Sequence, residues 1–222
     1  QACGPQHVLT TPAALAAYDS DGLSFHRYPP EAVVLPGNVE ELKQVLAWMR
    51  TENAAYVIRG AGTGLSGGAV ASEGGLVLHL SRLKRVLSVD PLNLVAELEP
   101  GVVLNALNKH LEPYGLFFPP DPSSGFACTL GGNVAENAGG IRCFKYGVVA
   151  NYVLGLELLT PDGTLVTLGG PAGGKGGALG QDWKTLFVGS EGLLGVILRI
   201  WIRLRPIPEA TRTYLATYPD LE

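Results

Sequence analysis

Cysteine is scarce in this sequence, with three among 222 residues: Cys3, Cys128 and Cys143. An odd number without a Cys-x-x-Cys pair excludes a dense disulfide framework, and the four scattered histidines offer no zinc-binding spacing. Such cysteine usage is typical of a reducing compartment. We therefore expect a cytoplasmic protein without a structural metal, with peripheral attachment to a membrane as an alternative location.

Strong charge and long apolar runs are also missing. Charged residues make up 16% of the chain and sum to a net charge of −4, with no long basic run, so nucleic acid is not an expected partner. No apolar run approaches the roughly 18 residues that span a bilayer, so we expect no transmembrane segment. The 46% of hydrophobic residues suffice for a packed core in one large domain or two small lobes.

Glycine, by contrast, is abundant, with 30 residues gathered mainly in three clusters. The clusters cover Arg59–Gly75, Gly125–Gly147 and Gly169–Gly180. Strongly patterned sequence surrounds the first two, which argues against low-complexity disorder there. The third cluster has the composition of a mobile surface loop.

The first cluster opens with Arg59–Ala69, in which five of eleven residues are glycine. It follows Tyr56–Ile58, a short apolar run that predicts a buried strand. Glycines at this density let backbone N–H groups converge on an anion, and Thr63 and Ser66 add hydroxyl donors. The pattern predicts a loop wrapped around a phosphate or pyrophosphate, and an ordinary flexible surface loop is the alternative.

The same loop contains the spacing Gly-x-Gly-x-x-Gly, at Gly62, Gly64 and Gly67. A Rossmann dinucleotide site would need a helix directly after these glycines and an acidic residue about 20 positions further on. Residues 68–75 are a poor helix sequence. We therefore reject a Rossmann site and keep the phosphate loop.

Helix and strand patterns are mixed along the chain, which indicates an α+β fold. A Pro-Asp-Gly turn within Thr160–Thr164 predicts a hairpin in the second half. The predicted helical segments are Pro12–Tyr18, a helix capped by Asn38 that runs to about Glu52, Val102–Leu111, and a short turn at Asp182–Phe187. The predicted strands are Ala32–Leu35, Tyr56–Ile58, Leu76–Leu80, Val86–Val89, Leu94–Leu98, Val153–Leu159, Leu165–Leu168, Val196–Leu204 and Thr213–Thr217.

The segment Phe118–Gly140 is a second candidate for ligand contact. It is rich in proline and glycine, and a loop of this length is uncommon unless it is functional. A long connection between two lobes is the alternative. The polar residues are small donors that suit close packing against a flat polar ligand: Ser123, Ser124, Thr129, Asn133 and Asn137.

Four separated motifs carry a family resemblance: Arg59–Ala69, Pro119–Gly140, Lys145–Gly147 and Gly189–Ile197. Together they resemble the FAD-binding domain of the vanillyl-alcohol oxidase/PCMH flavoprotein superfamily. Within it they look most similar to the GlcD-type subunit of glycolate oxidase and the related D-lactate and D-2-hydroxyglutarate dehydrogenases. The resemblance implies a two-lobed α+β domain of the PCMH type with FAD between the lobes.

The resemblance also implies a division of the chain. We expect an N-terminal segment at 1–30, a first FAD-binding lobe at 31–117, a second lobe at 118–210, and the start of a substrate domain at 211–222. Relatives continue into a C-terminal substrate domain, so the residues that would grip a hydroxyacid there are expected to be absent from these 222 residues.

Cofactor contacts follow from the same resemblance. The first loop would wrap the pyrophosphate through its backbone amides, the second segment would line the ribityl chain and flavin ring, and the last motif would lie along the adenosine or the lobe junction. The first loop contains no histidine, which points to non-covalent FAD. The expected FAD-binding residues are Arg59, Gly60, Ala61, Gly62, Thr63, Gly64, Leu65, Ser66, Pro119, Asp121, Ser124, Thr129, Gly131, Gly132, Asn133, Asn137, Gly140, Tyr146, Gly147, Glu191, Gly192 and Ile197.

The implied activity is oxidation of a small D-2-hydroxyacid, such as glycolate or D-lactate, by hydride transfer from the substrate α-carbon to flavin N5. A partner subunit and an electron acceptor would be further partners, and no catalytic residue is assigned. The alternatives are a reductase of the UDP-N-acetylenolpyruvoylglucosamine type, an electron-transfer subunit, or a non-catalytic FAD-binding module.

Two cysteines and two cationic residues lie in or just after the segment Phe118–Gly140. Cys128 and Cys143 are expected to be small buried hydrophobes rather than catalytic thiols. Arg142 and Lys145 could attract an anionic substrate. Their alternative roles are solvated charges or ion-pair partners of Glu136.

Overall fold

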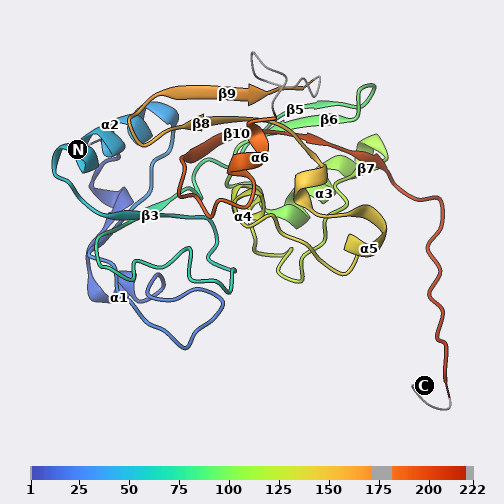
Figure 1. The fold of residues 1–222 in the computed structure, drawn as a ribbon, viewed down its shortest axis with the longest axis horizontal. Coiled ribbons are helices and arrows are strands. Elements are labelled where there is room, and N and C mark those ends of the chain that lie inside the picture. The colour runs from blue at the N-terminus through green and yellow to red at the C-terminus, as the bar shows by residue number, and fades with distance from the viewer. Residues whose placement is uncertain (1, 172–181, 219–222) are drawn as a thin grey trace.

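Two β-sheets form the framework of the protein, and they meet along a shared core (Figure 1). The computed structural model describes residues 2–171 and 182–218. The first sheet has the strand order β1-β2-β4-β3 and the second has the order β5-β6-β10-β8-β9. The mixture of parallel and antiparallel pairs with helices packed on them agrees with the predicted α+β class.

The first sheet is built around parallel strands joined by a helix. Its strands are β1 (Val8–Leu9), β2 (Ala32–Val34), β3 (Tyr56–Arg59) and β4 (Leu76–His79), with α1 (Pro12–Leu15) after β1. The strand β4 pairs in parallel with both β2 and β3. The crossover from β2 to β3 is α2 (Val39–Thr51), as the sequence pattern predicts.

The N-terminus of α2 is fixed by a reciprocal cap. The Asn38 side chain accepts a hydrogen bond from the Glu41 N–H at 2.9 Å, and the Glu41 carboxylate accepts one from the Gly37 N–H at 2.7 Å. These bonds satisfy amides that the helix itself leaves free. The buried face of the helix then packs on the first sheet through Leu42, Val45, Leu46 and Met49.

The second sheet is antiparallel throughout. The predicted hairpin is confirmed as β8 (Val153–Leu159) paired with β9 (Leu165–Gly169), and the two predicted strands β5 (Val86–Asp90) and β6 (Val95–Leu98) also pair with each other. The long strand β10 (Val196–Arg203) lies between β6 and β8. On its exposed side Arg199 forms ion pairs with Glu97 and Glu157 at 2.9 and 3.4 Å, which ties the three strands together on the solvent face.

This sheet includes strands from the expected first lobe. Both β5 and β6 precede residue 117, yet β6 pairs with β10 of the expected second lobe. The division between the two sheets falls between His79 and Val86, whereas the expected boundary between the lobes lies at 117. The pairing of β6 with β10, about a hundred residues away, depends on tertiary contacts, and the local sequence of either strand does not predict it.

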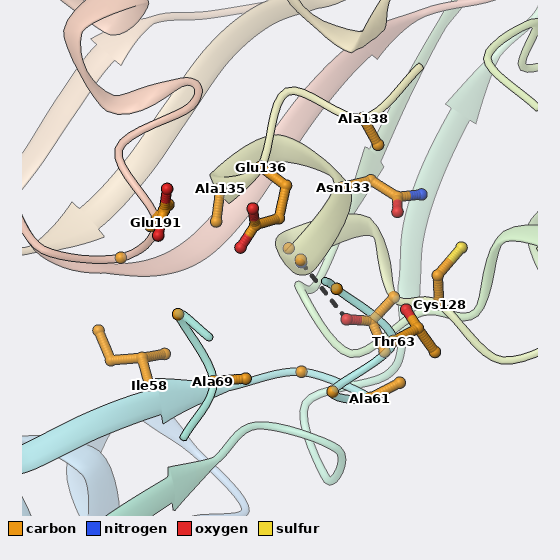
Figure 2. Close-up of a pocket in the computed structure, with 18 of the residues that line it drawn as sticks. Ile58, Ala61, Thr63, Ala69, Cys128, Asn133, Ala135, Glu136, Ala138 and Glu191 are labelled. Atoms are coloured by element: carbon orange, nitrogen blue, oxygen red, sulfur yellow. Dashed lines mark hydrogen bonds between the residues drawn. The ribbon is translucent and has the colours of Figure 1, made fainter. Parts of the chain in front are cut away.

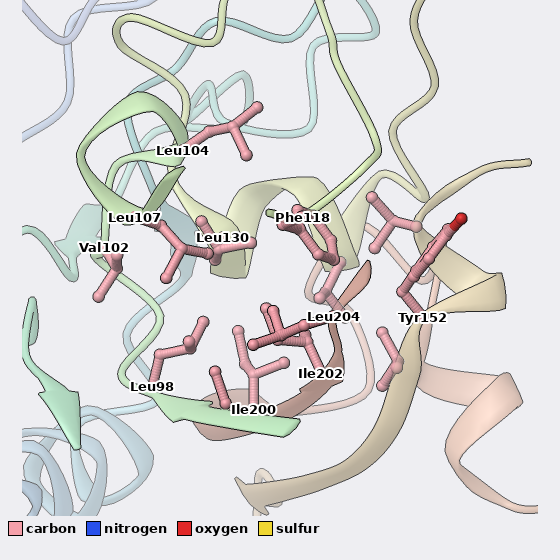
Figure 3. Close-up of a cluster of buried hydrophobic side chains, with 14 of the residues drawn as sticks. Leu98, Val102, Leu104, Leu107, Phe118, Leu130, Tyr152, Ile200, Ile202 and Leu204 are labelled. Atoms are coloured by element: carbon pink, nitrogen blue, oxygen red, sulfur yellow. The ribbon is translucent and has the colours of Figure 1, made fainter. Parts of the chain in front are cut away.

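Helices cover the inner face of the second sheet and close its core (Figure 3). They are α3 (Leu104–Leu111) and α4 (Leu130–Ala135). Figure 3 shows Leu107 and Leu130 pointing from these helices toward Ile200 and Ile202 of β10. The smaller elements are the 3₁₀ turns Pro5–His7, Glu112–Tyr114 and Val149–Asn151, the short pair β7 (Leu116–Phe117) with β11 (Arg205–Pro206), and the one-turn helices α5 (Cys143–Tyr146) and α6 (Lys184–Phe187).

The helix α4 lies inside Phe118–Gly140, which was expected to be a loop. Its sequence, Leu-Gly-Gly-Asn-Val-Ala, has poor helix propensity because two of six residues are glycine. Packing outweighs this preference, since Leu130 and Val134 lie four positions apart and are both fully buried in the core.

Two further expectations concern the C-terminal half. Thr213–Thr217 was expected to be a strand, and this is wrong, because residues 208–218 are exposed, extend away from the body and pair with no strand that the structure describes (Figure 1). The expected mobile loop at Gly169–Gly180 lies mostly outside the described residues. Among the helices described in 2–171 and 182–218, none is long and apolar enough to cross a membrane.

Candidate cofactor cleft

A cleft lies where the ends of the two sheets meet, with the first glycine cluster on one wall and α4 on the other (Figure 2). Figure 2 shows Ile58 and Ala69 on the first wall, facing Glu136 and Glu191 on the second. The lining residues are Asp21, Ile58, Gly60, Ala61, Gly62, Thr63, Gly64, Ser66, Gly68, Ala69, Leu80, Pro100, Pro122, Ser124, Cys128, Thr129, Gly131, Gly132, Asn133, Ala135, Glu136, Ala138, Glu191, Gly192, Gly195 and Ile197.

The loop Arg59–Ala69, called the glycine loop below, begins where β3 ends, and the Arg59 side chain lies beneath it. The Arg59 side chain is buried and donates to the Ala69 carbonyl at 3.0 Å, so it joins the two ends of the loop. Gly62 has a φ of +68°, and a Cβ there would overlap the Arg59 guanidinium. The loop therefore bends around a buried cation, and a side chain at Gly62 would displace it.

Burial lowers the pKa of the Arg59 guanidinium, while the nearby Tyr18, Asp21 and Asp19 oppose this change. Arginine nevertheless keeps its charge in proteins, because its intrinsic pKa lies far above neutral pH. Arg59 thus places a positive charge behind the loop, where it can favour an anion on the cleft side.

The second wall begins at the N-terminus of α4. Thr129 caps this helix by accepting from the Gly132 N–H at 3.4 Å. The same hydroxyl abuts Gly60, where a Cβ would collide with it, so the glycine loop and the helix start are in direct contact. Asn133 is 4% exposed, and its side-chain nitrogen Nδ2 has no hydrogen-bond partner among the described residues. A buried amide donor on the wall of a cleft is a position that a ligand acceptor would satisfy.

Three carboxylates stand along the cleft: Asp21, Glu136 and Glu191. Glu136 accepts from the Ser66 hydroxyl at 3.2 Å, which bridges α4 and the glycine loop. Partial loss of hydration raises the pKa of Glu136, and the charges of Glu191 and Asp21 act in the same direction, while the Ser66 bond opposes them. No lysine, arginine or histidine lines the cleft within the described residues.

Most of the predicted FAD-binding residues line this cleft. The last motif joins the lobes there, because Gly192 lies against Ile58 of β3, and Ile197 is buried beside it at the base. The predicted residues among the lining set are Gly60, Ala61, Gly62, Thr63, Gly64, Ser66, Ser124, Thr129, Gly131, Gly132, Asn133, Glu191, Gly192 and Ile197.

The other predicted residues lie outside the lining set. Arg59 is behind the loop, and Leu65 is 67% exposed on its outer side. Pro119 is buried, and the rest lie on or near α5: Asp121, Asn137, Gly140, Tyr146 and Gly147.

Contacts around α5 explain these positions. Asn137 accepts from the Ala150 N–H at 2.9 Å, and Gly140 packs so closely on the Asp121 carbonyl that no Cβ would fit. The Tyr146 carbonyl accepts from the Tyr152 hydroxyl at 2.8 Å. Each of these residues holds backbone in place around α5, which is a structural role next to the cleft.

Several lining residues carry no site signal in the sequence. Asp21 comes from the irregular N-terminal segment, and Pro100 and Leu80 follow strands. Glu136 lies next to predicted residues, but a single glutamate among glycines does not indicate which wall it faces. The hydroxyl pattern around Ser66 gives no indication of the Glu136 partner either, because 70 residues separate the two.

The cysteines and nearby cations take mainly structural positions. Cys128 is buried in the cleft wall, and burial raises the pKa of its thiol, so the reactive thiolate is disfavoured. Cys143 is only partly buried, so the expectation of a buried cysteine is wrong there; its sulfur accepts from the Gly140 N–H at 2.8 Å. Arg142 pairs with Asp121 at 3.0 Å rather than with Glu136, and Lys145 lies over the Tyr146 ring at 5.0 Å.

A family model described as FAD binding domain matches residues 30–169. The glycolate oxidase subunit GlcD of Escherichia coli (strain K12) is 42% identical over 215 residues, which cover 97% of this chain and 42% of that protein. The D-2-hydroxyglutarate dehydrogenase of Xanthomonas citri pv. viticola is 36% identical over 222 residues, covering 100% of this chain and 47% of that protein.

Two further similarities extend the comparison. The D-lactate dehydrogenase of Archaeoglobus fulgidus is 39% identical over 212 residues, covering 91% of this chain and 47% of that protein. Among solved structures, an alkyldihydroxyacetonephosphate synthase superposes with a TM-score of 0.79 at 25% identity, covering 93% of this chain and 39% of that one. The chain therefore spans less than half the length of these relatives.

The residues of the cleft fit a flavin dinucleotide. The glycine loop has the composition of a backbone nest for a pyrophosphate, and a buried arginine lies behind it. The unpartnered Asn133 amide and the hydroxyls of Ser124 and Thr129 offer hydrogen bonds to a polar ring or chain. The helix that a Rossmann site would need after the glycines is absent among residues 60–75, which agrees with the rejection of such a site from the sequence.

Proposed function

The chain belongs to the FAD binding domain family, and from this premise we propose that it is the FAD-binding part of a D-2-hydroxyacid dehydrogenase or oxidase. The observation that carries the proposal is the cleft in which a glycine loop faces the start of α4. Relatives named for glycolate, D-lactate and D-2-hydroxyglutarate support the substrate class. The name of the Escherichia coli relative, a glycolate oxidase subunit, supports a partner subunit.

The residues of this chain would divide the work of binding. The amides of Gly60–Ser66 would hold the pyrophosphate, with Arg59 stabilising its charge through the loop. Ser124, Thr129 and Asn133 would orient the rest of the cofactor. When bound, FAD supplies a two-electron oxidant for the α-carbon of a hydroxyacid.

Buried apolar groups would keep water from the inner end of the cleft. Ile197 and Leu80 are both less than 9% exposed and line it. Lower local polarity strengthens every hydrogen bond that the wall makes to a ligand. The protein therefore contributes binding, orientation and exclusion of water.

Non-covalent attachment is part of the proposal. No histidine is present among the described lining residues, and the Cys128 thiol is held in its unreactive protonated form by burial. Precipitation of the FAD-loaded chain with acid tests this directly. We expect the yellow colour to remain in the supernatant, and flavin that precipitates with the protein would contradict non-covalent binding.

Cofactor identity is tested by titrating the purified chain with FAD and, in parallel, with FMN, following flavin fluorescence. FMN carries the same ring but lacks the pyrophosphate and adenosine, so FAD should bind at least about tenfold more tightly if the glycine loop holds the pyrophosphate. Equal affinities for the two flavins, or no binding of either, would refute the proposed role of the loop.

The reductase alternative predicts a different electron donor. A flavoprotein of the UDP-N-acetylenolpyruvoylglucosamine reductase type draws its electrons from a nicotinamide cofactor. Anaerobic addition of NADPH to the loaded chain should leave the flavin oxidised under our proposal. Rapid bleaching by NADPH would favour the reductase.

A further inference from the structure

The N-terminal segment Tyr18–Leu23 lies against the glycine loop, although it precedes the residues that the family model matches. Its contacts reach the loop at three places. They involve a carboxylate, a backbone amide and an aromatic ring, and each meets a different part of the loop.

The carboxylate of Asp21 makes the first contact. Its Oδ2 accepts from the Gly67 N–H at 2.8 Å, while its Oδ1 accepts from the Leu23 N–H at 2.8 Å. The second bond closes a local turn, which fixes the direction of the carboxylate without help from the loop. Asp21 also lines the cleft, so this bond lies at the edge of the cofactor site.

Backbone packing makes the second contact. The Gly22 N–H donates to the Gly64 carbonyl at 2.9 Å. A Cβ at Gly22 would lie 2.8 Å from the carbonyl oxygens of Thr63 and Gly64, which is closer than side chains approach backbone. The segment therefore fits against the loop backbone only because residue 22 has no side chain.

The third contact lies under the loop. The Arg59 guanidinium lies 5.5 Å from the centroid of the Tyr18 ring, within the range of a cation–π interaction. Tyr18 is itself held edge-on by His79 of β4 at 5.3 Å. The cation around which the loop bends is thus positioned partly by the same segment that binds the rim of the loop.

We propose that Tyr18–Leu23 is a strap that sets the conformation of the glycine loop before the cofactor binds, with Asp21 as its positioning residue. This inference rests on the proposed function, in which the loop amides hold the pyrophosphate of FAD. A loop with five glycines in eleven residues loses much conformational entropy when it binds a ligand, and a strap that orders the loop beforehand reduces that loss.

Asp21 could act on cofactor binding through its hydrogen bond or through its negative charge, and these two effects have opposite signs. A carboxylate near a pyrophosphate repels it, so charge alone would make Asp21 unfavourable for binding. If the residue assists binding, it does so through its hydrogen bond to Gly67. Asparagine has one acceptor oxygen, so it can keep the Gly67 bond without the charge but gives up the Leu23 bond, and alanine can accept neither bond.

The test compares Asp21→Ala with Asp21→Asn, using Asp90→Ala as the matched control. Asp90 accepts from the Leu92 N–H at 3.1 Å in a similar turn of the second sheet, away from the cleft. Two quantities are measured: amide hydrogen exchange of residues 60–70 in the flavin-free chain, and FAD affinity. We expect Asp21→Ala to speed exchange at Gly64–Gly67 about tenfold and to weaken FAD binding by a similar factor, whereas Asp21→Asn has a clearly smaller effect on both and Asp90→Ala matches the unmodified protein.

Each outcome decides the proposal. Unchanged loop exchange in Asp21→Ala would overturn the strap. Exchange in Asp21→Asn as fast as in Asp21→Ala would also contradict it, because the Gly67 bond that asparagine can keep would then not order the loop. Gly22→Ala provides a second variant that should speed exchange in the same residues. Exchange is read without flavin, so absence of FAD binding in the unmodified chain would refute the proposed function while the strap is still tested.

Discussion

Glu136 is the residue whose protonation is most directly linked to the cleft. Its carboxylate faces Ser66 across the cleft and shares the site with Asp21 and Glu191. A pyrophosphate brought to the adjacent loop adds negative charge, which raises the pKa of Glu136 further. FAD binding is therefore expected to take up protons and to weaken as the pH rises above the ordinary glutamate pKa of 4.5.

Replacement of this carboxylate gives a measurable prediction. Glu136→Gln keeps an acceptor for Ser66 but removes the charge, so FAD should bind about two- to fivefold more tightly at pH 7.5, with a flatter dependence on pH. Titrations at pH 5.5 and pH 7.5 measure both effects, with the exposed Glu52→Gln as control. Weaker FAD binding by Glu136→Gln at pH 7.5 would show that the ionised carboxylate assists the cofactor.

His79 links pH to stability rather than to binding. Burial, together with the charge of Arg59, lowers the pKa of His79 from 6.5 to about 4, and its Nδ1 has no hydrogen-bond partner among the described residues. The unfolded chain binds a proton at this site near pH 6.5, whereas the folded chain does so only near pH 4. Stability is therefore fully present above pH 6.5 and is lost as the pH falls toward 4, by about 2–3 kcal/mol from this group.

His79→Phe removes the titration and keeps an aromatic ring beside Tyr18. We expect its free energy of unfolding to fall less between pH 7.5 and pH 4.5 than that of the unmodified chain, by about 2 kcal/mol. Urea unfolding at the two pH values measures the difference, with the exposed His110→Gln as control. Equal acid sensitivity in all three proteins would place the loss of stability at other groups.

At the scale of elements, the glycine loop depends on the space around Arg59. Gly62→Ala introduces a Cβ that overlaps the guanidinium and also strains a positive φ, which costs about 1–3 kcal/mol. FAD affinity should fall at least about tenfold, because the loop can no longer bend around the cation. A flavin fluorescence titration measures the change.

Gly115→Ala is the matched control for that experiment. Gly115 also has a positive φ, +65°, but a Cβ there meets no atom within 4 Å, and it follows the 3₁₀ turn after α3. This variant should lower the free energy of unfolding through backbone strain and leave FAD affinity unchanged. A loss of affinity in both variants would indicate general destabilisation rather than an effect on the loop.

Element prediction from the sequence succeeded where the local pattern and the tertiary environment agree. The α2 cap at Asn38 and the hairpin turn around Asp162 are local signals, and both elements form where expected. α4 was missed because its two glycines oppose a helix, and only the burial of Leu130 and Val134 reveals why it forms. The short run at Thr213–Thr217 has strand propensity, but no strand in the described part of the chain lies beside it to pair with.

The candidate site divides in the same way. The glycine loop and the Thr129–Asn133 segment carry their own chemical signals and were predicted from them together with the family resemblance. Asp21 and the Ser66–Glu136 pair reach the cleft only through folding, because each joins residues at least 46 positions apart. No spacing rule connects such residues in a single sequence.

For the molecule as a whole, the charge of the cleft bears on its substrate. A hydroxyacid is an anion, and its carboxylate needs a cation or several donors to hold the α-carbon in place. The described lining residues offer three carboxylates and no cationic side chain, and Arg142 is already paired with Asp121. Orientation of reactants can account for about 7–11 kcal/mol of a reaction barrier, so poor positioning should make oxidation slow.

We therefore expect these 222 residues, loaded with FAD, to be reduced very slowly by D-lactate, glycolate or D-2-hydroxyglutarate. Bleaching of the flavin absorbance under anaerobic conditions measures the rate, and dithionite shows that the bound flavin can be reduced. Fast bleaching with any of the three acids would mean that this chain already holds a complete substrate site.

The core shared by the two sheets has a consequence for cofactor exchange. Leu159, Val196 and Leu198 of the second sheet are buried in the same cluster as Leu42 and Leu78 of the first. The two sheets therefore share one core, which opposes a hinge motion that would separate them. A bound flavin would leave when the glycine loop opens locally, and the contacts of the strap Tyr18–Leu23 oppose this opening. Its residence time should therefore be governed by local opening of a few residues rather than by domain motion.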